Sequence, residues 1–248
     1  MSKSAQHLAA GATIVAVLMV ATPHAHAGDS NGNLQIRLGV TGIVFDDDVR
    51  SVTAGGGAVD LKSAIGADAK VGDTVVPTAT ITYFFTPNWA IEAICCTAHI
   101  SAEGKGGLAS FGDLADAWVL PPIITLQYRF DRLHGFQPYV GAGGQWIHYW
   151  AGKGDNVLGA GDVDIEDSFG FALQAGVDYD LGQGWSLNLD VKKTWLDTKI
   201  TWKDTDPALG LGEVTSKVDL DPWWFTASLG YRFNVEDLFH RTSAAPLK

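Results

Sequence analysis

The chain has 248 residues, of which 46% are hydrophobic and 18% are charged, and its formal net charge is −11. Such an acidic chain repels nucleic acid phosphates, which argues against DNA or RNA as a partner. Beyond residue 22 no stretch of about 18 uninterrupted apolar residues occurs, so a bundle of membrane-spanning helices is not expected.

The first 27 residues have the pattern of a secretory signal peptide. Lys3 supplies a positive start, residues 8–21 form an apolar core, and Ala25-His26-Ala27 is a small-x-small cleavage site. Removing this segment takes away Lys3 and no acid, so 16 of the 17 basic residues remain beside 28 acidic ones, a net charge of −12. We expect an exported protein.

Eight stretches alternate between apolar and small or polar side chains, with the period of two that only an extended strand sorts onto two faces. In chain order they cover residues 34–41, 77–85, 89–96, 118–130, 136–146, 168–181, 185–202 and 223–233. The clearest, 168–181, would rise ~35 Å at ~3.3 Å per residue and a tilt of about 40°, enough to cross the apolar band of a membrane. In 185–202 the apolar phase changes near Lys193, so that Leu196, Ile200 and Trp202 fall on the apolar side, and we expect a β-bulge there.

The connections between these strands are alternately short and long. Short turns fall at 87–88, 131–135 and 183–184, and long polar segments at 46–73, 103–117, 151–166 and 203–217. Outer-membrane barrels have short periplasmic turns and longer outside loops, and an even number of antiparallel strands closes without an edge. The sequence therefore predicts an all-β fold, an eight-stranded antiparallel up-and-down transmembrane β-barrel over residues 28–233. Residues 234–248 are expected to form a disordered periplasmic tail.

Aromatic residues are expected to form two belts at the two membrane interfaces. The belt at the short turns comprises Phe85, Trp89, Tyr128, Phe130, Phe136, Tyr179, Trp185, Tyr231 and Phe233. The belt at the long loops comprises Trp118, Trp146, Trp150, Trp195, Trp202 and Trp223.

Charged residues within the strands share the polar phase. They are Arg37, Glu92, Arg129, Asp190, Lys192 and Arg232. A Lys or Arg facing lipid at the membrane midplane costs about 2–4 kcal/mol, so we expect all six to face the lumen, where opposite charges can pair.

Catalytic, cofactor and metal motifs are not evident. His99 or His148 could meet Ser101 at the outer rim, but no spacing motif supports a catalytic site. The acidic run 46–48 lacks the glycine and closing Glu of a calcium loop. The adjacent Cys95 and Cys96 point to opposite faces of a strand, which disfavours a disulfide between them. We expect neither an enzyme nor a bound cofactor or metal.

Several segments together resemble the OmpW-type eight-stranded outer-membrane proteins. They are Tyr83-Phe84-Phe85-Thr86 with Asn88 and Glu92, Leu120-Pro121-Pro122, Gln137-Pro138-Tyr139-Val140-Gly141-Ala142-Gly143, Gly176-Val177-Asp178-Tyr179, Asp221-Pro222-Trp223 and Gly230-Tyr231-Arg232-Phe233. The resemblance spans nearly the whole mature chain in the right order. It implies a barrel in the outer membrane of a Gram-negative bacterium, in contact with lipid.

The resemblance also implies a function, the passive uptake of small hydrophobic solutes through a narrow passage entered from outside and left sideways through the wall. Ile94 matches a residue that constricts this passage. Cys96, Val119, Ile123 and Lys192 share the inward phase with it.

Two positions depart from the family pattern. Lys192 stands where family members can carry a bulky apolar lumen residue, and Ala98 where they often carry a proline that opens the wall. Pro121 and Pro122 on the neighbouring strand could interrupt the ladder instead, or could mark a harmless bend near the interface. The terminal aromatics Tyr231 and Phe233 match the sequence read by the barrel assembly machinery.

Two alternatives remain open. A structural or adhesive barrel would act through its extracellular loops and keep a lumen plugged by ion pairs. A secreted soluble barrel would reverse the two faces and leave the aromatic belts unexplained.

Overall fold

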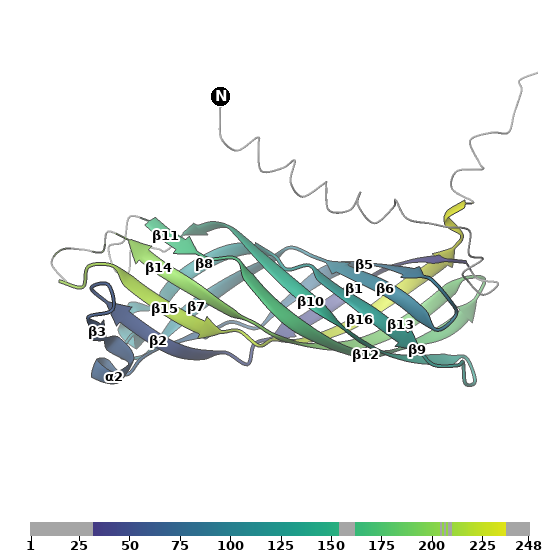
Figure 1. The fold of residues 1–248 in the computed structure, drawn as a ribbon, viewed down its shortest axis with the longest axis horizontal. Helices are drawn as coiled ribbons and strands as arrows, with labels where there is room; N and C mark the ends of the chain where they lie inside the picture. Colours follow the sequence, from purple (N-terminus) through teal and green to yellow (C-terminus); the bar gives the residue numbers. More distant parts are fainter. Residues whose placement is uncertain (1–31, 154–161, 204, 206, 208–209, 237–248) are drawn as a thin grey trace, which may run out of the picture.

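The computed structural model describes residues 32–153, 162–203, 205, 207 and 210–236. The predicted signal peptide lies outside the described residues, as does most of the predicted tail. Eight strands form one closed antiparallel sheet in the order β12-β13-β16-β1-β5-β6-β9-β10, and β10 pairs with β12 to close it. The predicted eight-stranded barrel is confirmed (Figure 1). Its strands are β1 (Leu34–Val44), β5 (Thr74–Phe84), β6 (Trp89–Cys95), β9 (Ile123–Arg129), β10 (Phe136–Lys153), β12 (Ser168–Gly182), β13 (Trp185–Trp195) and β16 (Trp223–Phe233).

The first and last strands lie side by side, with Leu34 opposite Phe233 and Val44 opposite Trp223. This pairing leaves no free sheet edge, as a lipid environment requires. The two ends of the described chain and the tight turns lie at one end of the barrel. In the β12–β13 turn Gly184 has φ +82°, and a Cβ there would stand 2.6 Å from the carbonyl oxygen of Arg232, so only glycine fits.

The outer face of the barrel is apolar and exposed. Phe169, Leu38 and Leu189 are 74%, 64% and 62% exposed, and Phe171 and Leu173 are exposed beside them. Aromatic rings gather at the short-turn end, where the Trp89–Tyr128 and Trp185–Tyr231 ring centroids are 5.1 and 5.0 Å apart. Polar side chains fill the inside at this end. This is the orientation of a membrane barrel rather than a soluble one.

Strand β13 and its continuation β14 (Asp197–Lys203) correct the predicted phase change. No register shift occurs near Lys193 in the pairing with β12 or β16, so the predicted β-bulge is wrong. Leu196 and Trp202 are buried inside, and Trp202 is therefore not part of the outer aromatic belt. The backbone keeps its alternation, and the inner face changes from polar to apolar.

All four of the predicted polar segments contain strands, or parts of strands, that extend the barrel wall. One sheet has the order β11-β14-β15-β2-β3, and β4, β7 and β8 continue the wall beside the upper part of β10. The added strands are β2 (Asp48–Ala54), β3 (Val59–Asp60), β4 (Ala67–Val71), β7 (Ala98–Gly106), β8 (Asp113–Leu120), β11 (Asp162–Ile165) and β15 (Val214–Asp219). Two short helical turns, α2 (Leu61–Ile65) and η3 (Ala109–Phe111), join them. No helix among the described residues is long and apolar enough to span a membrane.

The predicted strand 118–130 is divided into β8 and β9 at Pro121-Pro122. Neither proline has an N–H group to donate to a ladder, so continuous pairing stops there. The first residues of the tail contact the start of the barrel. The Val235 N–H donates a hydrogen bond to the side-chain oxygen of Asn33 at 2.9 Å.

Candidate functional site

Six buried charges, three cations and three anions, form a network in the membrane-spanning half of the lumen. The members of this ionic core are Arg37, Arg129, Lys192, Glu92, Asp178 and Asp190, which are at most 6% exposed. Side chains along a strand alternate between the outer and inner faces of the barrel, and all six of these charged side chains point to the lumen. The numbers of positive and negative charges are equal.

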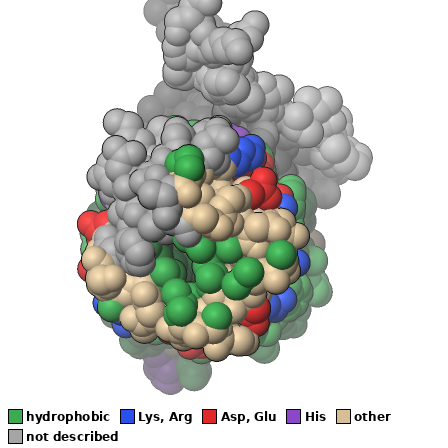
Figure 2. Space-filling view, turned by 90° about the vertical axis from the view of Figure 1, so that its left-hand side faces the viewer, with side chains coloured by type: hydrophobic (Ala, Val, Ile, Leu, Met, Phe, Trp, Pro, Cys, Tyr) green, Lys and Arg blue, Asp and Glu red, His purple; other side chains and the backbone are tan. Residues whose placement is uncertain are grey.

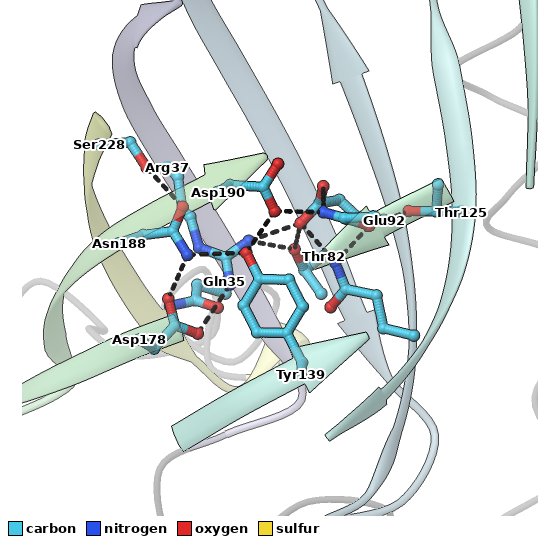
Figure 3. A network of polar contacts seen from close by, with 12 residues as sticks. Gln35, Arg37, Thr82, Glu92, Thr125, Tyr139, Asp178, Asn188, Asp190 and Ser228 are labelled. Carbon is cyan, nitrogen blue, oxygen red and sulfur yellow. Dashed lines mark hydrogen bonds and ion pairs between the residues drawn. The ribbon is translucent and has the colours of Figure 1, made fainter. Parts of the chain in front are cut away.

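Glu92 is the centre of this core (Figure 3). Its carboxylate oxygens accept a hydrogen bond from Arg37 at 2.7 Å and pair with Lys192 Nζ at 3.0 Å. Gln127 and Gln174 donate further hydrogen bonds to Glu92 at 2.8 and 2.7 Å. The two oxygens of the buried Glu92 carboxylate thus accept from four donors, and a buried carboxylate requires such hydrogen bonds.

Asp178 and Asp190 hold the remaining cations. Asp178 accepts from Arg37 at 2.8 Å and also pairs with Arg129. Asp190 pairs with Lys192 at 2.5 Å and accepts from the Tyr139 hydroxyl at 2.7 Å.

Tyr139 lies between Asp190 and Arg129. Its hydroxyl donates to Asp190, and the guanidinium of Arg129 stands 4.6 Å from its ring centroid. Together these contacts place paired charges across the lumen at this level.

Arg232, the sixth predicted lumen charge, lies apart from the ionic core. Its guanidinium stands 3.6 Å from the Phe84 ring centroid, and its Nε donates to the Gly32 carbonyl oxygen at 2.8 Å. A small polar cavity of about 30 Å³ lies beside it at the short-turn end.

At the opposite end the extended wall encloses an apolar cavity of about 130 Å³. Figure 2 looks onto this end and shows hydrophobic side chains gathered in a central hollow, with polar and charged side chains around it. No charged residue is among the described residues that line it. The lining comes from α2 and from both sheets of the extended wall, and includes Val52, Leu61, Val71, Ile100, Leu114, Trp202, Val214, Val218 and Leu220.

A packed apolar floor separates this cavity from the ionic core. Ile94 follows Glu92 on the inner face of β6, and Ile123 precedes Thr125 on that of β9; each is 1% exposed. Ile43 and Trp224, each 2% exposed, complete the floor, and the Trp224 indole N–H donates to Thr194 at 3.2 Å.

The predicted gate residues are brought together only in part. Ile94, Cys96, Val119 and Ile123 are buried in one apolar cluster with the cavity lining. None of these four lines the cavity itself. Lys192 belongs to the ionic core.

The wall beside the floor is interrupted. The β6–β9 ladder ends at the pair Ile94–Ile123, and the β7–β8 ladder begins at Ala98–Val119 in the same register. On the other side of the same segment, the β5–β6 ladder ends at Ala79–Cys95 and the β4–β7 ladder resumes at Val71–Ala102. Residues 96–97 therefore lie outside the ladders on both sides. The predicted lateral-opening residues Ala98, Pro121 and Pro122 border this segment.

Comparison with known proteins identifies the family. The family model described as "OmpW family" matches residues 30–233. The chain belongs to the OmpW family. It is accordingly a bacterial outer-membrane barrel in contact with lipid, and it is not an enzyme.

Individual relatives support the assignment over most of their length. Outer membrane protein W of Vibrio cholerae is 30% identical over 90% of this chain and 97% of that protein. The crystal structure of OprG from Pseudomonas aeruginosa has a TM-score of 0.75 at 29% identity and covers 84% of this chain and 99% of that one. The solid-state NMR structure of the outer membrane protein AlkL in lipid bilayers has a TM-score of 0.63 at 27% identity, covering 92% and 99%.

Polar residues at the outer rim and in the extended wall of this OmpW-family chain have other contacts in the described part of the structure. His148 contacts Asp167 on the exposed outer face at 2.9 Å, whereas Ser101 lines the cavity, so these two residues do not form a catalytic pair. Among the described residues no group of three or more His, Cys, Asp or Glu could hold a metal ion. Asp47 instead accepts from the Val71 N–H at 2.9 Å, and burial raises the pKa of its carboxyl.

Sequence reasoning missed Asp178 of the ionic core, and it missed Tyr139 and Gln174, which donate hydrogen bonds to Asp190 and Glu92. All three lie on the inward phase of their strands, so the alternation that selected Glu92 would also have selected them. Their partners could not be foreseen, because they come from strands up to 141 residues away.

Proposed function

We propose that this OmpW-family barrel gives small hydrophobic molecules a passive path from outside into the membrane, entering the apolar cavity and leaving sideways through the wall. The observation that carries this proposal is the apolar cavity above a packed floor and a charge-balanced core. A further support is a 24% identical relative from Pseudomonas aeruginosa that is named as a dibenzothiophene metabolism operon protein. Dibenzothiophene is a molecule of the apolar class that such a cavity would admit.

The cavity supports entry from outside because its lining is apolar almost throughout. Transfer of apolar surface from water into such a lining is favourable by about 25 cal/mol per Å². A solute small enough for the hollow would therefore collect there without a specific polar contact.

The ionic core argues against onward passage along the axis. An apolar molecule at the level of Glu92 would have to separate Arg37 and Lys192 from their carboxylates. Leaving a buried charge without its partner costs about 3–5 kcal/mol, and here several pairs would be broken at once. This cost exceeds what burial of a small solute supplies.

The wall segment 96–97 is the exit we propose, with Ala98, Pro121 and Pro122 as its border. Opening it breaks fewer backbone hydrogen bonds than opening any continuous ladder, since neither side is paired. The predicted gate residues Ile94, Cys96, Val119 and Ile123 pack at this level, and we assign them to the closed state of the passage.

A cross-link tests this route. In a background with Cys95→Ser and Cys96→Ala, the pair Thr97→Cys and Leu120→Cys would span the interruption, because the common register places these positions opposite each other. Oxidation should slow naphthalene entry into whole cells deleted for the gene and complemented with this variant, and reduction should restore it. Leu187→Cys with Leu229→Cys, opposite each other in the continuous β13–β16 ladder, is the matched control and should leave entry unchanged. Equal entry with the Thr97–Leu120 bridge closed and open would refute the lateral route.

The ionic core also favours a second candidate function, a structural or adhesive barrel with a plugged lumen that acts through its extended outer wall. Equal naphthalene entry into cells with and without the protein would remove the transport proposal and leave this one.

Export and assembly complete the proposal. Residues 1–27 would direct export, and Tyr231 and Phe233, whose ring centroids are 6.0 Å apart at the end of β16, would be read by the barrel assembly machinery. Residues 234–248 would remain in the periplasm as a tail.

A further inference from the structure

Two buried polar atoms without a hydrogen-bond partner among the described residues lie on one part of the inner wall, beside two buried hydroxyl groups. The two atoms are the amide nitrogen and oxygen of Gln145, and the hydroxyls are those of Ser168 and Tyr149, which interact with each other. Gln145 and Ser168 are each 2% exposed. Most buried polar groups in proteins are paired, so a cluster of this kind requires an explanation.

The cluster lies at the edge of the apolar cavity that is nearest to the apolar floor. Gln145 and Tyr149 are on the inner face of β10, and between them Ile147 is paired with Ser168 of β12. Tyr149 lines the cavity, whereas Gln145 stands at the level of the floor, opposite Ile123 of β9. The cluster is thus within reach of the lower end of a molecule that fills the cavity.

The chemistry of the cluster fits an uncharged polar group. The Gln145 amide can both donate and accept, and each hydroxyl can do either. No charged side chain lines the cavity within the described chain, so an ionised group would be buried without a counter-charge. The carboxylates and cations of the ionic core are already occupied with one another.

We propose that Gln145, Tyr149 and Ser168 form a hydrogen-bonding subsite that selects apolar solutes carrying one uncharged polar group, such as a ketone or an alcohol. The apolar body occupies the cavity and the polar group points to the floor. This inference rests on the proposed function, because it names the class of solute that the cavity prefers.

The test compares acetophenone with α-methylstyrene, which has the same shape with C=CH₂ in place of C=O. Dissociation constants are measured by equilibrium dialysis with the purified barrel in detergent, each corrected for partition into protein-free micelles. The wild type should bind acetophenone about fivefold more tightly, the worth of one net neutral hydrogen bond. Benzoate, the charged analogue, should bind more weakly than either.

Gln145→Leu should remove the preference for acetophenone and leave the binding of α-methylstyrene unchanged. It should also fold at least as stably as the wild type without ligand, since it deletes unpaired polar atoms. Ser168→Ala provides a second variant, expected to reduce the preference. Ser216→Ala, a buried serine that lines the cavity away from the cluster, is the matched control and should keep the preference.

Each outcome is decisive. Equal binding of the two ligands by the wild type, or an undiminished preference in both Gln145→Leu and Ser168→Ala, would overturn the subsite while the transport proposal stands. Absence of binding of either ligand would instead contradict the proposed function itself.

Discussion

Glu92→Gln is the perturbation that tests the ionic core most sharply. The carboxylate is 2% exposed and pairs with Arg37 at 2.7 Å and Lys192 at 3.0 Å. At an effective dielectric constant of about 20, each attraction is roughly 5–6 kcal/mol before desolvation is subtracted. Removing one partner of a buried pair costs about 3–5 kcal/mol net. With m roughly 2 kcal/mol/M, the urea midpoint of unfolding from lipid vesicles should fall by about 2 M.

The companion variant Arg37→Met with Glu92→Gln separates charge balance from simple loss of contacts. It leaves two intact pairs, Arg129 with Asp178 and Lys192 with Asp190. It should therefore be more stable than Glu92→Gln alone, although it carries one more substitution. Both variants are compared by their urea midpoints in the same vesicles. An unchanged midpoint for Glu92→Gln, or a further loss in the double variant, would refute the reasoning.

Three further predictions follow from the same geometry. Ile94→Lys places an unpaired charge in the apolar floor and should slow naphthalene entry into whole cells several-fold, and entry at the wild-type rate would contradict the assignment of Ile94 to the passage. Ala117→Phe, which fills the cavity from its lining, should also slow entry, whereas Ala142→Phe on the outer face should not; equal rates for the two would show that the hollow is not used. The Asp60 carboxylate accepts a hydrogen bond from the Ser63 hydroxyl at 2.6 Å and caps α2. These hydrogen bonds lower the pKa of Asp60. The cap is therefore fully present above the ordinary carboxyl pKa and is lost as pH falls through the lowered pKa. Amide exchange in Leu61–Ile65 should rise at that acid limit, and in Asp60→Ala it should be fast at every pH.

The barrel strands could be predicted because the membrane imposes a simple rule on them. One face must be apolar and the other polar, and Phe169, Phe171 and Leu173 against Ser168, Gly170 and Ala172 follow this rule without a break. The same rule turned Arg37 and Glu92 inward before any partner was known. Their pairing depends on tertiary distances that alternation does not encode.

The extended wall escaped prediction because it obeys a different rule. Outside the membrane the outer face is polar and the inner face apolar, so Val214, Val218 and Leu220 alternate with Thr215, Lys217 and Asp219 in the sense opposite to a lipid-facing strand. If such segments are interpreted as lipid-facing strands, with an apolar outer face and a polar inner face, they resemble polar loops. For the same reason the inward Leu196 and Trp202 were interpreted as a change of phase, when it was the environment of the inner face that changed.

The central claim is that a hydrophobic solute occupies the apolar cavity and does not enter the ionic core. Intermolecular NOEs from protonated naphthalene to the methyl groups of the barrel in deuterated lipid nanodiscs test it directly. The account predicts contacts with Ile100 and Val218, which line the cavity, and none with the methyl groups of Thr82, which accepts from Arg37, and Thr125, which lies opposite Glu92. Contacts at Thr82 and Thr125 would place the solute on the axis and contradict the lateral path.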